Sequence, residues 1–203
     1  IAVMTMTGIG STLAFNIVEI TGGTLWIILV VVMLTCIVLS MGLPSTALYI
    51  VLAVAAAPSL IQAGVSPLAA HFFVFWFGAL SNITPPVALA SYTAAGIAGG
   101  DAMKTSWQAL RLALPGFIIP FMIAYNPINL LQPADGETLT IWSVGSIIVT
   151  TFIGIFALAV SLGNFYVTRL TVIERIFFFG GALCLIKPGL LTDLIGISIV
   201  GAF

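Results

Sequence analysis

The chain has 203 residues, of which 61% are apolar and 5% are charged, and its net charge is −1. A soluble domain carries roughly 25% charged residues, and a chain of this length cannot bury so many apolar side chains in one core. This excludes a soluble globular protein. Five Lys and Arg residues exclude a nucleic-acid partner, and two cysteines in apolar runs, Cys36 and Cys184, exclude a disulfide scaffold. We predict an all-α integral membrane protein built as a polytopic helical bundle.

The first predicted elements are the end of a preceding transmembrane or scaffold helix, residues 1–23, and a helical hairpin, residues 24–61. The two hairpin arms, 24–40 and 47–61, are apolar, and a Gly-Leu-Pro turn in residues 41–46 separates them. Each arm is shorter than the roughly 20 residues of a full crossing. We favour a re-entrant hairpin over two complete crossings, which charge alone does not distinguish.

The next element is a transmembrane helix over 68–98, interrupted by Ser81-Asn82-Ile83-Thr84-Pro85-Pro86. Proline has no backbone N–H, so the two prolines should free the carbonyls of Ser81 and Asn82, as Pro44 should free that of Ser40. Irregular backbone persists at membrane depth only where protein or a wet cavity satisfies it. Both interruptions are therefore candidate sites.

Each interruption also begins a new half-helix. Thr84 followed by Pro85 predicts an N-cap and a first helical residue. Ser45 and Thr46 are expected to cap a helix that begins at residue 47. Helix N-termini carry partial positive charge and free N–H groups, so they suit a carboxylate.

The remaining elements complete the transport half and add a C-terminal region. An amphipathic interfacial helix is predicted over 102–112, followed by a span over 112–125 in which Pro115 and Pro120 are packing kinks. Residues 126–203 form an extra membrane region. It contains a polar stretch to 140, a plain span over 141–162 and a final apolar segment, 176–203, that either spans or is re-entrant.

The positive charges predict the orientation. Lys104 and Arg111 place the connection at 99–111 on the cytoplasmic side, and Arg169 and Arg175 do the same for the later connection. The stretch 126–140 contains Asp135 and Glu137 but no Lys or Arg, which favours the outside. These assignments alternate, and they place the loop at 62–67 outside.

The chemistry of the two breaks favours a cation site whose ligands are neutral oxygen atoms. Neither contains an ionisable residue, whereas a proton-coupled site usually shows Asp, Glu or His within the membrane. His71 lies near the outer surface, and we interpret it as an interfacial or packing residue. Carbonyl and hydroxyl oxygens suit Na+, and paired interrupted segments are typical of the midplane site of a secondary transporter.

Other classes stay open at this point. A helical channel would line several helices with polar stripes. A structural membrane subunit would have no substrate site of its own. An intramembrane enzyme would need a nucleophile with a base or paired carboxylates, and the acids here lie near loops, so we predict no enzymatic activity.

Three segments carry a resemblance to a known family: MGLPSTALYIVLAVAAAPSL, GVSPLAAHFFVFWFGALSNITPPVALASYTAAGIAG and WQALRLALP. They resemble the large membrane subunit of tripartite ATP-independent periplasmic (TRAP) transporters, and most closely the fused permeases that work with TAXI-type binding proteins. The resemblance covers about residues 20–125. The segment from Thr140 to Gly189 looks like the extra C-terminal region of those permeases.

The resemblance implies an elevator-type transporter in a bacterial or archaeal inner membrane. Its moving domain would hold two inverted hairpins, each followed by an interrupted helix, with sodium at the tips and breaks. A periplasmic TAXI-type protein would deliver an organic anion, which we expect to be a carboxylate. Residues 24–61 would be the outward-facing hairpin. Because the inward-facing hairpin and the small-subunit region are not in the sequence, we expect the C-terminal portion of a longer permease that works with its N-terminal half.

One departure from the family bears on the ligands. Many relatives have an Asp in the first break, where this chain has Leu43-Pro44-Ser45-Thr46. Sodium, the coupling ion, is therefore expected on neutral oxygens of Gly42, Ser45, Thr46, Asn82 and Thr84, with no other cofactor. The expected substrate contacts are Ser45, Thr46, Ser81, Asn82, Thr84 and Pro85.

Overall fold

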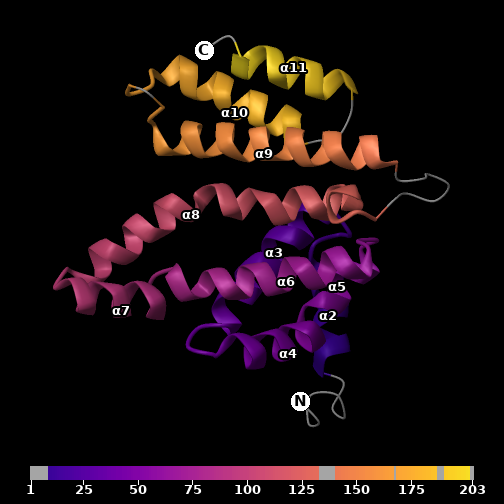
Figure 1. Cartoon of the computed structure of the whole chain (residues 1–203). Coiled ribbons are helices and arrows are strands. Elements are labelled where there is room, and N and C mark those ends of the chain that lie inside the picture. Colours follow the sequence, from indigo (N-terminus) through magenta and orange to yellow (C-terminus); the bar gives the residue numbers. More distant parts are fainter. Residues whose placement is uncertain (1–8, 133–139, 167, 187–189, 202–203) are drawn as a thin grey trace. The chain divides into compact units, whose positions relative to one another are not determined.

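The computed structural model describes residues 9–132, 140–166, 168–186 and 190–201 (Figure 1). These residues are helical almost throughout, as predicted, and the β structure among them is an isolated bridge between Phe165 and Arg169. The chain divides into two compact units, Ile1–Ala113 and Leu114–Phe203. The division falls inside one long helix, and each unit is described by itself.

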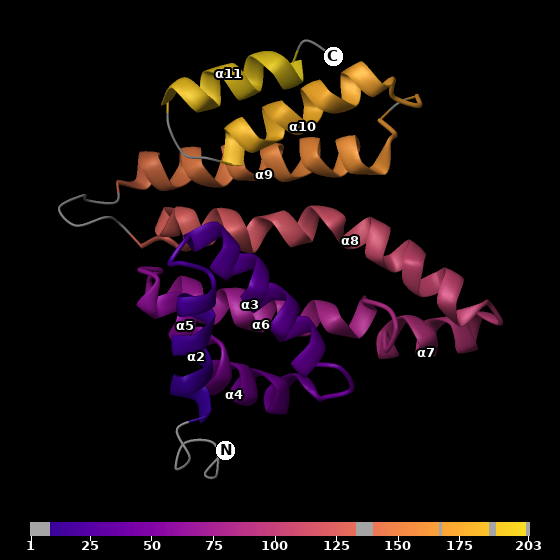
Figure 2. The same ribbon diagram turned by 180° about the vertical axis from the view of Figure 1, so that it is seen from behind.

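The first unit contains the predicted hairpin and the interrupted helix. Helix α6 is its centre, because α3, α4 and α5 all pack against it, while α2 contacts α3, α4 and α5 (Figures 1 and 2). The elements are α2 (Ile9–Ile20), α3 (Leu25–Leu39), α4 (Ser45–Ala55), α5 (Ala57–Gln62), α6 (Pro67–Leu80), η1 (Ser81–Ile83), α7 (Leu89–Ala98) and the first part of α8 (Ala102–Tyr125).

The core of this unit lies on one face of α6. Phe73 and Phe77 are one helical turn apart and fully buried, and their rings are in contact with centroids 4.8 Å apart and planes tilted by 60°. Residues of α3 and α4, including Val32 and Leu52, are fully buried around them. Ser66 accepts a hydrogen bond from the backbone N–H of Ala69 at the start of α6, which stabilises the entry into this helix.

Gly78 allows α4 to pack closely against α6, because it has no side chain. A Cβ atom at this position would lie 2.6 Å from Cδ2 of Leu48 and 2.7 Å from Cδ1 of Leu52. Leu48 and Leu52 are themselves fully buried. The second hairpin arm is therefore seated on the interrupted helix through the missing side chain of Gly78.

Two predicted helix boundaries differ from the observed ones. The second arm is not one helix, because the backbone breaks at Ala56 between α4 and α5, just before Pro58. The predicted pair 102–112 and 112–125 is a single helix, α8, with Pro115 and Pro120 inside it. Helix α8 begins at Ala102, where the interfacial helix was predicted to begin, and Asp101 caps it by accepting a 2.7 Å hydrogen bond from the N–H of Lys104.

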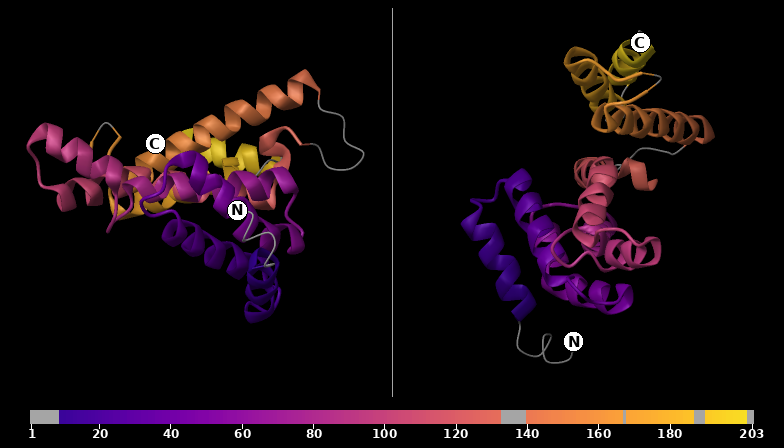
Figure 3. Two further views of the ribbon diagram at one scale, coloured as in Figure 1. Left: turned by 90° about the horizontal axis from the view of Figure 1, so that it is seen from below. Right: turned by 90° about the vertical axis from the view of Figure 1, so that its left-hand side faces the viewer.

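The second unit contains the remainder of α8 and the C-terminal helices: η2 (Pro127–Leu130), α9 (Ile141–Gly163), α10 (Val172–Ile186) and α11 (Leu190–Gly201). The span predicted over 141–162 matches α9. Helix α10 packs against both α9 and α11, and the three helices lie together in every view (Figure 3). Their core is formed by Ala157, Leu158, Val160, Phe178 and Ala182.

The final apolar segment consists of short helices. Helix α10 has 15 residues and α11 has 12, and they pack closely because Gly181 and Gly196 leave room for each other's helix. Asp135 and Glu137, used above to orient the chain, lie outside the described residues.

Two described helices are long and apolar enough to cross a bilayer, Ala102–Tyr125 and the Val144–Gly163 part of α9. The hairpin arms are shorter. At 1.5 Å per residue, the 15 residues of α3 extend about 22 Å, less than the roughly 30 Å of a hydrocarbon core. Their length favours the re-entrant interpretation of the hairpin.

Candidate functional site

The first break is the turn between α3 and α4. Gly42 has a φ of +79°, and the N–H of Leu43 donates a 3.2 Å hydrogen bond to the carbonyl of Ser40. The prediction that Pro44 leaves this carbonyl free is therefore wrong. The turn itself supplies the missing donor, and the Ser40 hydroxyl is bonded to the carbonyl of Cys36.

The two polar residues after this turn lie in the first turn of α4. The helix begins at Ser45, two residues earlier than predicted, and its N-cap is Pro44, which makes no side-chain capping bond. Ser45 and Thr46 thus do not cap a helix at residue 47. Both are exposed, and the N-terminal N–H groups of α4 lie beside them.

The second break is held by hydrogen bonds to the preceding turn. The hydroxyl of Thr84 donates to the carbonyl of Leu80 at 2.8 Å, and that of Ser81 donates to Gly78 at 2.7 Å. The N–H of Thr84 donates to the carbonyl of Ser81 at 3.2 Å. Of the two carbonyls predicted to be free, that of Ser81 is therefore satisfied. That of Asn82 accepts no hydrogen bond from the part of the chain described here.

The second half-helix begins later than the sequence indicates. Helix α7 starts at Leu89 rather than at Pro85, so Thr84 is not its N-cap. The residue before it, Ala88, is fully buried with a φ of +24°, and its N–H donates to the carbonyl of Thr84. The break therefore covers 84–88, which leaves more irregular backbone than the motif alone implies.

Oxygen atoms at the second break remain available as acceptors. The side-chain amide of Asn82 donates a hydrogen bond through Nδ2 to the carbonyl of Ala79, so the Oδ1 atom of Asn82 remains available as an acceptor. The hydroxyl oxygen of Thr84 donates its proton to the carbonyl of Leu80 and still has lone pairs that can accept. Both residues are half-buried. Ser81 differs, because it is 2% exposed and its hydroxyl is bonded to the carbonyl of Gly78. The half-buried Pro85 offers only its carbonyl.

The fold places the two breaks at the same end of the first unit. Helix α3 contacts η1, and the α3–α4 turn lies near the α6–α7 connection in both views (Figures 1 and 2). In the described residues no hydrogen bond joins the predicted residues of the turn to those of the second break. Gly42, Ser45 and Thr46 are exposed residues of the α3–α4 turn, and the half-buried Asn82 and Thr84 belong to the second break.

The site has no ionic groups in the described residues. No cluster of three or more His, Cys, Asp or Glu residues is found there. His71 lies on the first turns of α6, away from η1, and its Nδ1 is 3.2 Å from the hydroxyl of Tyr49. What the breaks present is a set of neutral oxygens, which suits a hard monovalent cation.

Sequence reasoning missed two residues beside the second break. The hydroxyl of Tyr92 donates a hydrogen bond to the carbonyl of Pro86 and ties α7 to the break. The hydroxyl oxygen of Ser91 is buried, and it has no hydrogen-bond partner among the residues that the structure describes. A separation of six residues between Pro86 and Tyr92 matches neither helical nor strand periodicity, so no sequence signal indicated the contact.

Comparison with known proteins gives one match. A family model described as "Tripartite ATP-independent periplasmic transporter, DctM component" matches residues 1–133. The matched region contains both breaks. No curated protein and no solved structure matches the chain.

Proposed function

Because the chain belongs to the DctM component family of tripartite ATP-independent periplasmic transporters, we propose that it is part of a sodium-coupled permease that imports organic anions. The family makes it a transport component of the cytoplasmic membrane that works with a periplasmic binding protein. We further propose the fused, TAXI-type branch, a carboxylate substrate and elevator-type alternating access.

One observation carries the sodium proposal. The second break offers three oxygens without a charged neighbour: the carbonyl of Asn82, its side-chain oxygen and the Thr84 hydroxyl oxygen. Gly42 and the hydroxyls of Ser45 and Thr46 would complete the set from the turn. Unwound backbone and hydroxyl groups of this kind hold sodium in transporters with broken helices.

The substrate carboxylate would meet the positive ends of the half-helices. Ser45 and Thr46 are exposed residues in the first turn of α4, a helix of 11 residues whose first N–H groups have no partner within the helix. Helix α7 offers a second N-terminus, displaced to Leu89. Alternating access would move the first unit's hairpin and interrupted helix as one body, since α4 is seated on α6 through Gly78.

The sodium proposal predicts a change in coupling. Replacing both Asn82 and Thr84 with alanine in the full-length protein should raise the sodium concentration for half-maximal uptake about tenfold, because two oxygen ligands are lost. The measurement is substrate uptake into proteoliposomes over a series of external sodium concentrations.

The matched control is Thr93→Ala. Thr93 is exposed on α7 and its hydroxyl bonds to the carbonyl of Leu89, outside the break. It should leave the sodium dependence unchanged. A double variant that requires no more sodium than the control would remove the second break from the sodium site.

The hairpin proposal predicts one-sided labelling. Single cysteines at Leu43, Gln62 and Gly100, in full-length protein without Cys36 and Cys184, should react differently with a membrane-impermeant maleimide. Position 62 should label from outside and position 100 from inside. Position 43 should label from neither side, or only from outside and less with sodium present. We place the outer cysteine at Gln62 because Gly64 has a φ of +90° that a side chain would strain.

Free labelling of position 43 from the cytoplasm would mean that 24–61 makes two complete crossings. The turn would then lie outside the membrane, and sodium binding by Ser45 and Thr46 would lose its physical basis.

A further inference from the structure

At the start of α10, the carboxylate of Glu174 bonds to the end of the helix and not to the neighbouring Arg175. The N–H of Thr171 donates a 2.6 Å hydrogen bond to the carboxylate of Glu174, and the N–H of Glu174 donates to the hydroxyl of Thr171 at 3.4 Å. This reciprocal pair is a capping box, which satisfies the first N–H groups of a helix. Glu174 is therefore engaged with the helix terminus and not with the next residue, Arg175.

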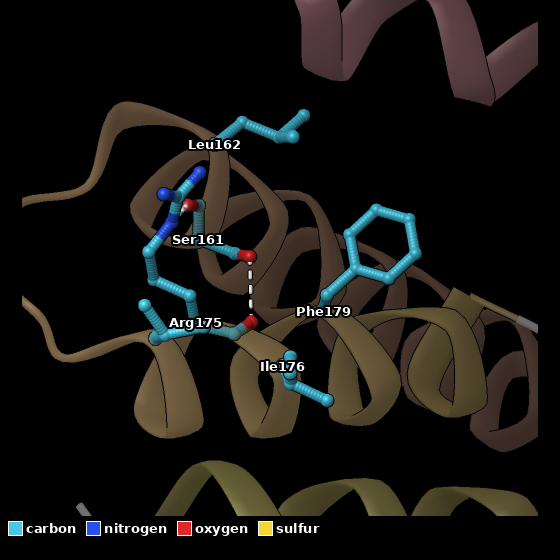
Figure 4. A pocket seen from close by; sticks show the side chains of 6 residues that line it. Ser161, Leu162, Arg175, Ile176 and Phe179 are labelled. Atoms are coloured by element: carbon cyan, nitrogen blue, oxygen red, sulfur yellow. Dashed lines mark hydrogen bonds between the residues drawn. The ribbon is translucent and has the colours of Figure 1, made fainter.

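Arg175 is fixed by the end of α9 instead. Its Nε donates a 3.1 Å hydrogen bond to the carbonyl of Ser161, and the hydroxyl of Ser161 donates to the carbonyl of Arg175 at 2.8 Å (Figure 4). Arginine has five N–H donors, so those on its two terminal nitrogens remain. Within the described ranges they have no hydrogen-bond or ion-pair partner. The guanidinium is thus held rigidly, half-buried and uncompensated.

An apolar pocket lies beside this guanidinium. Its volume is about 280 Å³, and it is lined by Ser161, Leu162, Val172, Arg175, Ile176 and Phe179. Figure 4 shows Leu162, Ile176 and Phe179 around the space that the arginine borders. The pocket combines one cation with hydrocarbon walls, and Val172 and Ile176 are 70% and 66% exposed in their helix.

The pocket lies at a membrane boundary. Ser161 and Leu162 are among the last residues of the candidate span Val144–Gly163, so the guanidinium is at the depth of lipid headgroups. The charge pattern places this end of the span on the cytoplasmic side. A free anion would leave the apolar walls bare, and a zwitterionic lipid would bring its own cation toward Arg175.

We propose that Arg175 and the adjoining pocket of α9 and α10 bind one anionic phospholipid. The guanidinium holds the phosphate through its terminal N–H groups, a geometry that arginine matches better than lysine. An acyl chain covers Leu162, Ile176 and Phe179. Basic pockets between membrane helices on the cytoplasmic side bind anionic headgroups in this way. The site belongs to the C-terminal unit and is independent of the sodium and substrate proposals.

The test is competition between two lipids for purified full-length protein. Native mass spectrometry counts bound lipid after equimolar phosphatidylglycerol and phosphatidylcholine with the same acyl chains are added. The wild type should retain phosphatidylglycerol about tenfold better, and Arg175→Gln should abolish that preference. Arg111→Gln removes the same charge from an exposed arginine of α8, which is not among the residues that line the Arg175 pocket, and it should keep the preference.

A second variant tests the apolar half without removing the charge. Ile176→Trp should fill the pocket and lower the retention of both lipids, and it remains informative if Arg175→Gln does not fold. Excess inorganic phosphate should not displace the lipid from the wild type. Equal retention of both lipids by the wild type, unchanged preference in Arg175→Gln, or displacement by phosphate alone would each overturn the proposal.

Discussion

Gly78→Leu is expected to detach the second hairpin arm from the interrupted helix and to abolish transport. Even a Cβ at this position would lie 2.6 Å from Cδ2 of Leu48 and 2.7 Å from Cδ1 of Leu52, and both leucines are fully buried. Overpacking by one methyl costs about 1–3 kcal/mol, and a leucine should cost more than about 4 kcal/mol. The thermal unfolding temperature in detergent and the rate of uptake should both fall.

Gly96→Leu is the matched control. Gly96 is also in a helix of the first unit, but nothing lies within 4 Å of its added Cβ. It should keep the wild-type unfolding temperature within a few degrees, since exposed substitutions usually change stability by less than about 0.5 kcal/mol. Equal unfolding temperatures for the two variants would show that α4 is not seated on α6 through Gly78.

The second large effect is expected at the turn of the hairpin. Gly42→Val should lower the apparent sodium affinity about 10- to 30-fold while leaving the global unfolding temperature nearly unchanged. Gly42 has a φ of +79°, a conformation that costs a β-branched residue about 2 kcal/mol. Because the binding-competent turn is then a minor state, apparent affinity falls by the fraction populated. Sodium-dependent uptake measures this.

The chain offers a way to separate backbone conformation from bulk at this position. Nothing lies within 4 Å of an added Cβ at Gly42, so Gly42→Asn has space and adopts positive φ far more readily than valine. It should retain most of the sodium affinity. Similar losses in the asparagine and valine variants would mean that the turn responds to any side chain, and that its left-handed backbone is not what sodium requires.

Local chemistry explains how much of the fold could be predicted. The breaks at 41–46 and 81–86 follow from proline, which cannot donate to the carbonyl one turn earlier, so the sequence is sufficient to find them. The end of the second break was not predictable, because Ala88 adopts a positive φ without being glycine.

The candidate site shows the same division. Asn82 and Thr84 could be nominated from their place before two prolines. The sequence could not predict which oxygens remain available as acceptors. The carbonyls of Ser81 and Ser40 both accept hydrogen bonds from backbone N–H groups three residues later, which the turns place beside them. The burial of Ser81, whose hydroxyl is bonded to the carbonyl of Gly78, also depends on how the helices pack.

By itself the sequence determined that this is a helical membrane protein, where its helices are interrupted and which transporter family it belongs to, since composition, proline and motif act over a few residues. Only the tertiary structure shows that α4 packs against α6 at Gly78, where Leu48 lies thirty residues away in the sequence. The hydrogen bond between Arg175 and Ser161 also appears only there. These contacts join residues far apart in the chain. Their energy depends on how whole helices pack, and no local pattern encodes which side chains will meet.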